Sequence, residues 1–169
     1  MPTIQRITPC LWFDVQAEDA VRFYVAIFKN SRVVQISYYG EEGYEVHGGK
    51  AGTVMTIDFE LDGQPFTALN GGPIFKFTEA ISFQIDCETQ EEVDYYWTRL
   101  SEGGDVEAQQ CGWLKDRFGL SWQVVPTVLR EMLNSADNAA AQRTMAALLR
   151  MKKLDIVSLK RAFAGEVIT

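Results

Sequence analysis

The sequence predicts an α+β fold of two βαβββ modules that form one curved mixed sheet with a cleft, followed by C-terminal helices. Two observations predict this class. Short segments of alternating apolar and polar residues, typical of half-buried strands, surround one segment with helical periodicity, and the same order begins again about 70 residues later. One half-sheet with one helix cannot close its own core, so the two modules are expected to pair.

The first module is expected over residues 1–74. Residues 4–14 alternate and predict a strand, with Ile7, Pro9, Leu11 and Phe13 on one face. A helix is expected over residues 16–28, because apolar residues recur at helical spacing: Ala20, Phe23, Tyr24, Ile27 and Phe28. Three more strands are expected at 33–39, 53–61 and 64–69, with a glycine-rich loop at 41–52 and a hairpin turn at Asp62-Gly63.

The second module is expected over residues 75–126, after the chain-breaking segment Asn70-Gly71-Gly72-Pro73. Residues 80–86 alternate like a strand. Thr89 is expected to cap a helix over residues 90–100, which Gly103-Gly104 ends. Three short strands are expected next, and Pro126 stops the last of them; their ranges are 105–110, 112–115 and 120–125.

A helical appendage is expected over residues 127–169. Residues 138–153 are rich in alanine, and Met145, Leu148, Leu149 and Met151 predict an apolar stripe along a helix. A second short helix is expected over residues 154–164. Two arrangements stay open: the helices pack on the modules or on a partner subunit, or they close a core of their own.

The composition narrows the classes of function. The 169 residues are 47% hydrophobic, which suits one compact domain or two small modules that share a core. The net charge of −7 argues against binding to nucleic acid or to an anionic membrane surface, since both need a basic face. The sequence contains no apolar run of membrane-spanning length, and residues 1–6 lack a signal-peptide core. Three widely spaced cysteines favour a reducing cytoplasm.

Several motifs are specific in combination. In the first module they are Trp12-Phe13-Asp14, followed by Ala20 and Phe23-Tyr24, and the segment 68–73. In the second module they are Glu91-Glu92-Val93-Asp94 with Trp97, and the segment 111–126 with its Gly-Trp-Leu-Lys-Asp-Arg-Phe-Gly core. The segment 151–156 follows near the C-terminus. Together they resemble the PhnB-like branch of the vicinal-oxygen-chelate superfamily, which includes glyoxalases, bleomycin-resistance proteins and dioxygenases. Members of this branch often carry the label 3-demethylubiquinone-9 3-methyltransferase. The resemblance implies paired βαβββ modules of the glyoxalase-like kind and a homodimer.

The resemblance also implies where a metal would lie. Many relatives hold a divalent metal with His, Gln or Glu side chains from the first and last strand of each module, where it polarises substrate oxygens. The corresponding positions here are Thr8 or Pro9, Thr67 or Ala68, Ala80 and Gln123. Only Gln123 offers a ligand of that kind, and the single histidine, His47, matches none of the positions. We therefore predict no metal centre and no cofactor, with a divalent metal as the alternative.

A ligand pocket is expected at Cys10, Trp12, Asn70, Ser82, Gln84, Trp113 and Gln123. Trp12 and Trp113 suit a flat or cationic ligand, whereas Trp122 alternates with Gln123 and is expected in the core. Each candidate has a structural alternative. Asn70 would organise the turn after its strand, and Cys10 would be a buried thiol, because a nucleophilic cysteine needs a nearby base.

Two further side chains have competing interpretations. Arg117 lies in a hairpin turn, where it would either bind an anion or point into solvent, and His47 is expected to be an exposed loop residue.

Three functions follow from these observations. The first is a small-molecule binding protein, or a metal-independent enzyme, that uses the cleft of a homodimer. The second is a divalent-metal enzyme of the glyoxalase or dioxygenase type. The third is a methyltransferase, as the family label states, although such enzymes normally bind S-adenosylmethionine at a glycine-rich turn after the first strand, where this chain has Asp14-Val15-Gln16.

Overall fold

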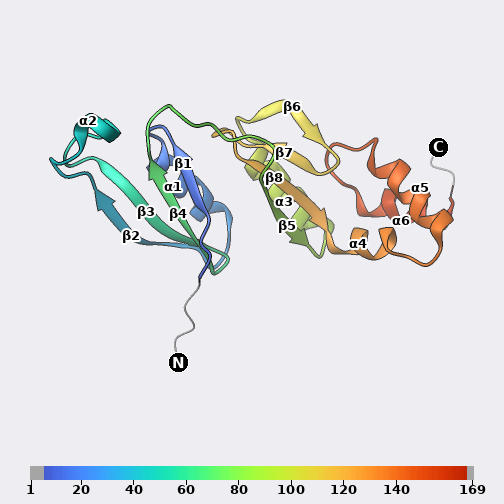
Figure 1. The fold of residues 1–169 in the computed structure, drawn as a ribbon. Coiled ribbons are helices and arrows are strands. Elements are labelled where there is room, and N and C mark those ends of the chain that lie inside the picture. Colours follow the sequence, from blue (N-terminus) through green and yellow to red (C-terminus); the bar gives the residue numbers. More distant parts are fainter. Residues whose placement is uncertain (1–5, 167–169) are drawn as a thin grey trace. The chain divides into compact units, whose positions relative to one another are not determined.

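The computed structural model describes residues 6–166 and divides the chain into two compact units, Met1–Phe77 and Thr78–Thr169. Each unit contains a four-stranded mixed sheet and a helix that packs against it (Figure 1). The α+β class with repeated βαβββ order is therefore confirmed, with helices after the second module. The pairing of the two sheets around a cleft stays a prediction.

The first unit follows the expected order of elements. They are β1 (Cys10–Phe13), α1 (Ala17–Ile27), β2 (Arg32–Tyr38), α2 (Tyr44–His47), β3 (Val54–Leu61) and β4 (Gln64–Asn70). The strand order is β1-β4-β3-β2, with β1 parallel to β4 and the other pairs antiparallel. At the hairpin between β3 and β4, Asp62 and Gly63 both have positive φ, 48° and 77°, as a two-residue primed turn requires.

The core of the first unit lies between α1 and one face of its sheet. Tyr24 and Ile27 of α1 are buried, and so are Ile57 and Phe59 of β3. Phe23 and Phe28, which the helical pattern placed in the apolar stripe, are only half-buried, whereas Val21 is buried. The apolar face of α1 is thus rotated slightly from the face that the spacing indicated.

One expectation for the first unit was wrong, and another is refined. The first strand begins at Cys10 rather than at residue 4, and Ile7 is 79% exposed instead of lying on a buried face; Ile4 and Gln5 are outside the described residues. The glycine-rich segment 41–52 connects the antiparallel strands β2 and β3, as a hairpin loop should, and it includes the short helix α2, which is flanked by glycines with positive φ, Gly43 and Gly48. Alternation of residue types shows which residues could form a strand, but a strand forms only where a neighbouring strand continues the ladder, and here the register with β4 begins at Cys10.

The second unit repeats the topology of the first. Its elements are β5 (Ser82–Cys87), α3 (Gln90–Ser101), β6 (Asp105–Gln110), β7 (Trp113–Lys115), β8 (Ser121–Pro126), α4 (Thr127–Leu133), α5 (Asn138–Leu148) and α6 (Ile156–Ala164). The strand order β5-β8-β7-β6, with β5 parallel to β8, matches that of the first sheet. Thr89 caps α3 as expected, because its hydroxyl accepts from the Glu92 amide.

The C-terminal helices pack on the second unit and share its core. Leu129, Met132, Leu154 and Leu159 form a buried cluster to which Val125 of β8 contributes. The chain between α5 and α6 also joins the hairpin between β6 and β7, since the Cys111 amide donates to the Met151 carbonyl. Of the arrangements left open by the sequence, the structure shows helices that close a core of their own and also pack on the second module through β8.

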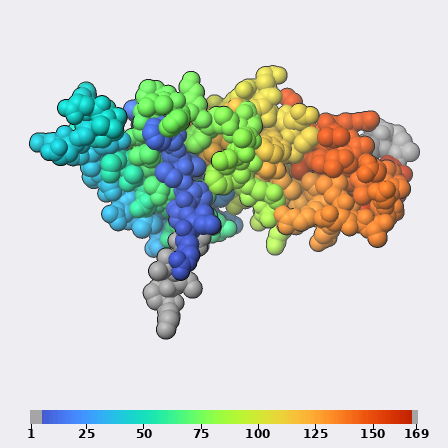
Figure 2. All heavy atoms as spheres, viewed as in Figure 1, coloured from blue at the N-terminus to red at the C-terminus, as the bar shows by residue number. Residues whose placement is uncertain are grey.

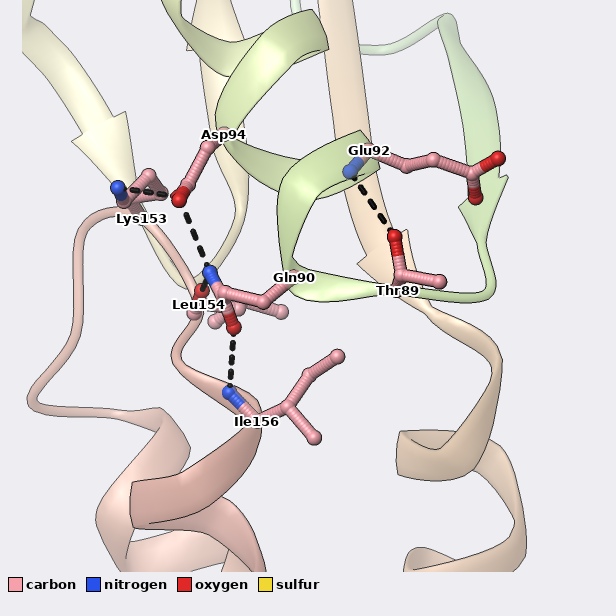
Figure 3. Close-up of polar contacts among 7 residues, drawn as sticks. All are labelled: Thr89, Gln90, Glu92, Asp94, Lys153, Leu154 and Ile156. Atoms are coloured by element: carbon pink, nitrogen blue, oxygen red, sulfur yellow. Dashed lines mark hydrogen bonds and ion pairs between the residues drawn. The ribbon is translucent and has the colours of Figure 1, made fainter.

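A polar contact fastens the C-terminal segment to α3 (Figure 3). The Gln90 amide group donates to the Leu154 carbonyl and its Oε1 accepts from the Ile156 amide, at 3.1 and 2.8 Å. Lys153 forms an ion pair with Asp94, one turn after Gln90. The first turn of α3 thus supplies the partners for backbone groups at the start of α6.

The expected apolar stripe of the helix over residues 138–153 was wrong in part. The buried residues of α5 are Ala140, Ala141 and Thr144, whereas Met145 and Leu149 are exposed. Alanines allow α5 to approach α6 closely, so the small residues face the core and the larger ones face outward. Within the described residues, no helix has the length and apolar character needed to cross a bilayer.

Candidate functional site

The sheet of the second unit has one face that α3 does not cover. Leu114 of β7 and Trp122 of β8 are buried on the α3 side, and Trp122 is thus a core residue as expected. Because side chains alternate along a strand, the residues between them lie on the opposite face, which we call the open face. Strand register aligns two rows across it: Ser82, Ser121 and Lys115, and beside them Gln84, Gln123 and Trp113. Four of the seven expected pocket residues therefore share one face.

Hydrogen bonds organise the open face of the second unit. The Gln123 amide group donates to Ser82 Oγ at 2.8 Å, which connects β8 to β5. The Gln84 amide group donates to Asp86 Oδ1 at 2.7 Å along β5. Gln84 is exposed, whereas Ser82, Gln123 and Trp113 are half-buried. The arrangement leaves polar groups next to an indole, as in many sites for small organic molecules.

Ser121, like Lys115 in the same row, lies on this face and was missed by the pocket prediction. It is 1% exposed, and its Oγ has no hydrogen-bond partner among the described residues. Buried hydroxyls are normally paired, so an unpaired one on an open face is a candidate for ligand binding. The sequence carries a weak signal for it: Ser121 stands two residues before Gln123 and thus on the same side of the strand.

A lysine borders the same row. Lys115 pairs with Glu79, a residue of the segment before β5, and the ammonium group of Lys115 lowers the pKa of the Glu79 carboxyl mainly by hydrogen bonding. The Lys115 side chain is 24% exposed and that of Glu79 is 61% exposed. The ammonium is therefore held at the face by a carboxylate that is itself largely in water.

The other expected pocket residues belong to the first unit. Cys10 is exposed on the face of the first sheet away from α1, beside Thr67, whose hydroxyl donates to Asp58. Removal of water from the thiol, and then the negative charge of Asp58, raise the pKa of Cys10. The buried-thiol alternative was wrong, and a raised pKa opposes the thiolate that nucleophilic chemistry needs.

Trp12 holds the segment that follows β4. Its indole nitrogen donates to the Gly72 carbonyl at 2.9 Å, and its ring meets Phe75 edge-on at 4.9 Å between centroids. Gly71 lies so close under the ring that an added Cβ would come within 2.3 Å of it. A glycine is therefore required at position 71 for the backbone to approach the Trp12 ring. These contacts give Trp12 a structural role in the first unit.

Asn70 also has a structural role. Its Oδ1 accepts from the Ala17 amide at 2.9 Å, and its amide group donates to the Val54 carbonyl at 3.1 Å. Ala17 is the first residue of α1, so Asn70 supplies a partner for an unpaired amide at the start of that helix. The structural alternative for Asn70 is thus correct in kind, although the side chain bridges a helix and a strand rather than its own turn.

The first unit contains a hollow of about 460 Å³, and of the seven expected pocket residues Asn70 lines it. The segment around α2 supplies part of its wall, and Figure 2 shows that segment, in cyan, at the surface. His47 stacks on Tyr39 at 4.4 Å between ring centroids, and its Nδ1 accepts from the Gly49 amide. His47 is therefore half-buried and organises the loop, which corrects the expectation of an exposed loop residue.

Arg117 packs back on the second unit rather than pointing freely into solvent. Its Nε donates to the Glu102 carbonyl at 3.1 Å, and its guanidinium lies 3.6 Å from the Glu102 carboxylate. These contacts tie the turn between β7 and β8 to the end of α3. Arg117 thus has a structural role and is not part of the open face.

The four positions that the resemblance assigns to a metal do not fit one. Thr8 is exposed, Thr67 already donates to Asp58, and Pro9, Ala68 and Ala80 have no side-chain ligand atom. Gln123 donates to Ser82 through its NH2 group, so its Oε1 is the one amide oxygen at these positions. Among residues 6–166, no three His, Cys, Asp or Glu side chains are grouped as a metal site requires. A divalent cation needs several oxygen ligands, or histidine and cysteine, and this donor set supplies neither.

The fold and the open face define the class of protein. Each unit has βαβββ order, and its first strand lies at the edge of the sheet, where it pairs in parallel with the last strand. The helix covers one face of each sheet, and the other face is not covered by that helix. This is the glyoxalase-like architecture of the vicinal-oxygen-chelate superfamily. Solved structures with the same fold include protein PA1353 from Pseudomonas aeruginosa, which is 18% identical with a TM-score of 0.56 and covers 73% of this chain and 98% of its own.

Within this class the family is also shown. Residues 5–125 match the family model described as 3-demethylubiquinone-9 3-methyltransferase. A PhnB protein from Bacillus cereus, named for the same activity, is 37% identical with a TM-score of 0.63, and the match covers 73% of this chain and 100% of that one. The chain belongs to this PhnB-like family. The family match ends at residue 125, before α4.

Other comparisons show less. The fosfomycin resistance protein FosX from Listeria monocytogenes, solved with Mn(II) and sulfate, is 16% identical with a TM-score of 0.51 and covers 78% of this chain and 97% of its own. That likeness shows the shared fold. A comparison with curated proteins found no match.

The family description implies S-adenosylmethionine, and the first unit does not fit the usual site for it. Such a site uses a glycine-rich turn after the first strand and free amides at the start of the next helix. The turn from β1 to α1 is Asp14-Val15-Gln16 and contains no glycine, and the Ala17 amide is bonded to Asn70. No methyl-transfer step can be derived from these residues.

Proposed function

We propose that the protein binds a small organic molecule on the open face of its second sheet, as a binding protein or a metal-independent enzyme of the PhnB-like family. The observation that carries this proposal is the row of Gln84, Gln123 and Trp113 beside Ser121, whose buried hydroxyl has no partner among the described residues. Amides, hydroxyls and an indole on one face offer directional hydrogen bonds together with a flat apolar surface.

The test is a ligand screen by tryptophan fluorescence followed by titration of variants. For any molecule that binds, Gln123→Ala and Gln84→Ala should weaken affinity by about tenfold each, the effect of losing one directional hydrogen bond of about 1.4 kcal/mol. Trp113→Phe should remove most of the fluorescence change. Gln64→Ala is the matched control, because Gln64 is exposed at the start of β4 in the first unit.

A ligand whose affinity is the same in all three open-face variants would place the binding site elsewhere and contradict the proposal. The hollow lined by Tyr39 and His47 would then be the next site to mutate. The two alternative functions have their own readouts. Retention of about one metal per chain in mass spectrometry would support the divalent-metal enzyme, and calorimetric binding of S-adenosylmethionine would support the methyltransferase.

We also propose that the protein acts as a homodimer in the cytoplasm. Three exposed apolar side chains, Met145, Leu149 and Val157, lie on the C-terminal helices, where a second copy would cover them. The three cysteines are free in the structure, which suits a reducing compartment. With a net charge of −7, neither nucleic acid nor an anionic membrane is proposed as a partner.

A further inference from the structure

We propose that the open face of the second unit recognises an oxyanion, a carboxylate or phosphoryl group, on its ligand, and that Glu79 occupies the place of this group on Lys115 until the ligand displaces it. The inference rests on the proposed function and specifies the chemistry of the molecule that binds. It follows from three side chains in one row, Lys115, Ser121 and Ser82, and from the partners that each of them has.

The row is built by strand register within the second unit. Ser121 of β8 lies opposite Ser82 of β5 on one side and opposite Lys115 of β7 on the other. Neighbouring strands are about 4.8 Å apart, so the backbone of Ser121 is about one strand spacing from that of each neighbour. An anionic group of two or three oxygens is of the right size to contact the centre and one end of such a row.

Each of the three side chains in the row can donate a hydrogen bond. Ser121 Oγ is buried without a partner among the described residues, so its hydrogen is available. Ser82 Oγ accepts from the Gln123 amide group, so its own hydroxyl hydrogen is not used in that bond and can be donated to a ligand. Lys115 contributes three N–H donors and a positive charge. Both hydroxyls can also accept, so the preference for an anion comes from the positive charge of Lys115, which has no acceptor, and the hydroxyl donors add to it.

The ion pair with Glu79 shows that Lys115 can bind a carboxylate. It is a carboxylate that reaches Lys115 from the segment before β5. Because the Glu79 side chain is 61% exposed, its ion pair is weakened by water and can be exchanged at little cost. A ligand oxyanion can accept a hydrogen bond from the Ser121 hydroxyl in addition to its contact with Lys115. The adjacent row with Trp113 and Gln84 can contact the rest of the organic molecule.

The experiment uses inorganic phosphate and acetate as probes on the full chain, with chloride at matched ionic strength to remove screening effects. Binding is followed by two-dimensional amide NMR. Glu79→Gln should tighten binding of at least one probe by up to about fivefold, the effect of a competing surface ion pair. Lys115→Gln and Ser121→Ala should each weaken it by about tenfold. Whichever probe binds more tightly identifies the group as phosphoryl or carboxylate.

Matched variants separate this effect from general changes in charge. Glu60→Gln removes the carboxylate of an ion pair with Arg32 in the first unit, and Lys160→Gln removes an exposed lysine of α6; neither should alter binding. Ser121→Ala should leave thermal stability without ligand unchanged or higher, because the lost hydroxyl has no partner among the described residues. Weaker binding together with undiminished stability is the signature expected of a ligand contact.

Two results would overturn the oxyanion assignment: shifts by phosphate and acetate no larger than those by chloride, or weaker binding in Glu79→Gln. If molecules found in the fluorescence screen still depended on Gln123, the proposed function would stand while the oxyanion assignment failed. If neither probes nor screened molecules depended on residues of the open face, both proposals would fail.

Discussion

Asp116 is the residue on which the hairpin between β7 and β8 depends. It is buried, and its carboxylate accepts from the amides of Phe118 and Leu120 and from the indole of Trp122. Three donors on one carboxylate offset the cost of burying its charge. Because Lys115 and Ser121 flank this hairpin, Asp116 also positions the open face without contacting a ligand.

Asp116→Asn should lower the free energy of unfolding by about 2–3 kcal/mol. The new NH2 group replaces a carboxylate oxygen, so at least one of the buried N–H groups that now donate to Asp116 would lose its acceptor. Asp58→Asn is the control, because Asp58 is exposed and accepts from one hydroxyl, that of Thr67; about 0.5 kcal/mol or less is expected. Urea denaturation followed by circular dichroism measures both. Equal losses in the two variants would show that the Asp116 bonds contribute little.

At the scale of elements, the N-terminal cap of α3 can be predicted from the sequence, whereas that of α6 can be predicted only in part. Thr89 and the first turn of α3 form a local signal that predicts the helix start correctly. The start of α6 is capped by Asp155, which bonds the Ser158 amide, and additionally by Gln90 of α3. The second contact joins segments more than sixty residues apart, so no local pattern contains it.

The cap of α6 makes stability depend on pH. Hydrogen bonds from Ser158 lower the pKa of the Asp155 carboxyl in the folded protein. A lowered folded pKa contributes stability above the unfolded pKa, near 3.9, and this contribution is lost as the pH falls through the folded pKa. Asp155→Asn can keep the cap but cannot titrate, so its stability should fall less than that of the wild type between pH 6 and about pH 3.

Thermal unfolding at a series of pH values measures this difference, and Asp155→Ala supplies the reference without a cap, with about 1 kcal/mol less stability at neutral pH. Parallel pH curves for the wild type and Asp155→Asn would show that the carboxyl does not couple to folding.

At the scale of the whole molecule, the C-terminal helices add a surface that the repeated modules lack. They pack on the second unit through Leu129, Met132, Leu154 and Leu159, yet α5 and α6 leave Met145, Leu149 and Val157 exposed. In the proposed homodimer these side chains are covered by a second copy. Leu149, which is 57% exposed, is the most direct position at which to test that proposal.

Leu149→Lys should shift the protein from dimer to monomer in sedimentation at micromolar concentration, because a charge would be buried without a partner at the interface. Val46→Lys is the control, since Val46 is exposed on α2 of the first unit. A monomeric wild type, or a variant that remains dimeric, would contradict the assignment of this surface.

The sequence by itself determined the order of strands and helix within each βαβββ module, the repeat of that module, the Asp62-Gly63 turn and the Thr89 cap, because periodicity, turns and caps are set by residues close together in the chain. It also placed Ser82, Gln84, Trp113 and Gln123 on strands that share one face. It did not indicate the short helices α2 and α4. It did not distinguish ligand contacts from structural ones for Trp12 and Asn70.

Only the tertiary structure decided the remainder. Asn70 meets Ala17, Gln90 meets Leu154, and Ser121 is buried without a partner among the described residues. Each of these facts depends on which distant segments pack together. Burial and hydrogen-bond partners are properties of neighbours in space, and a pattern of residue types along the chain does not contain them.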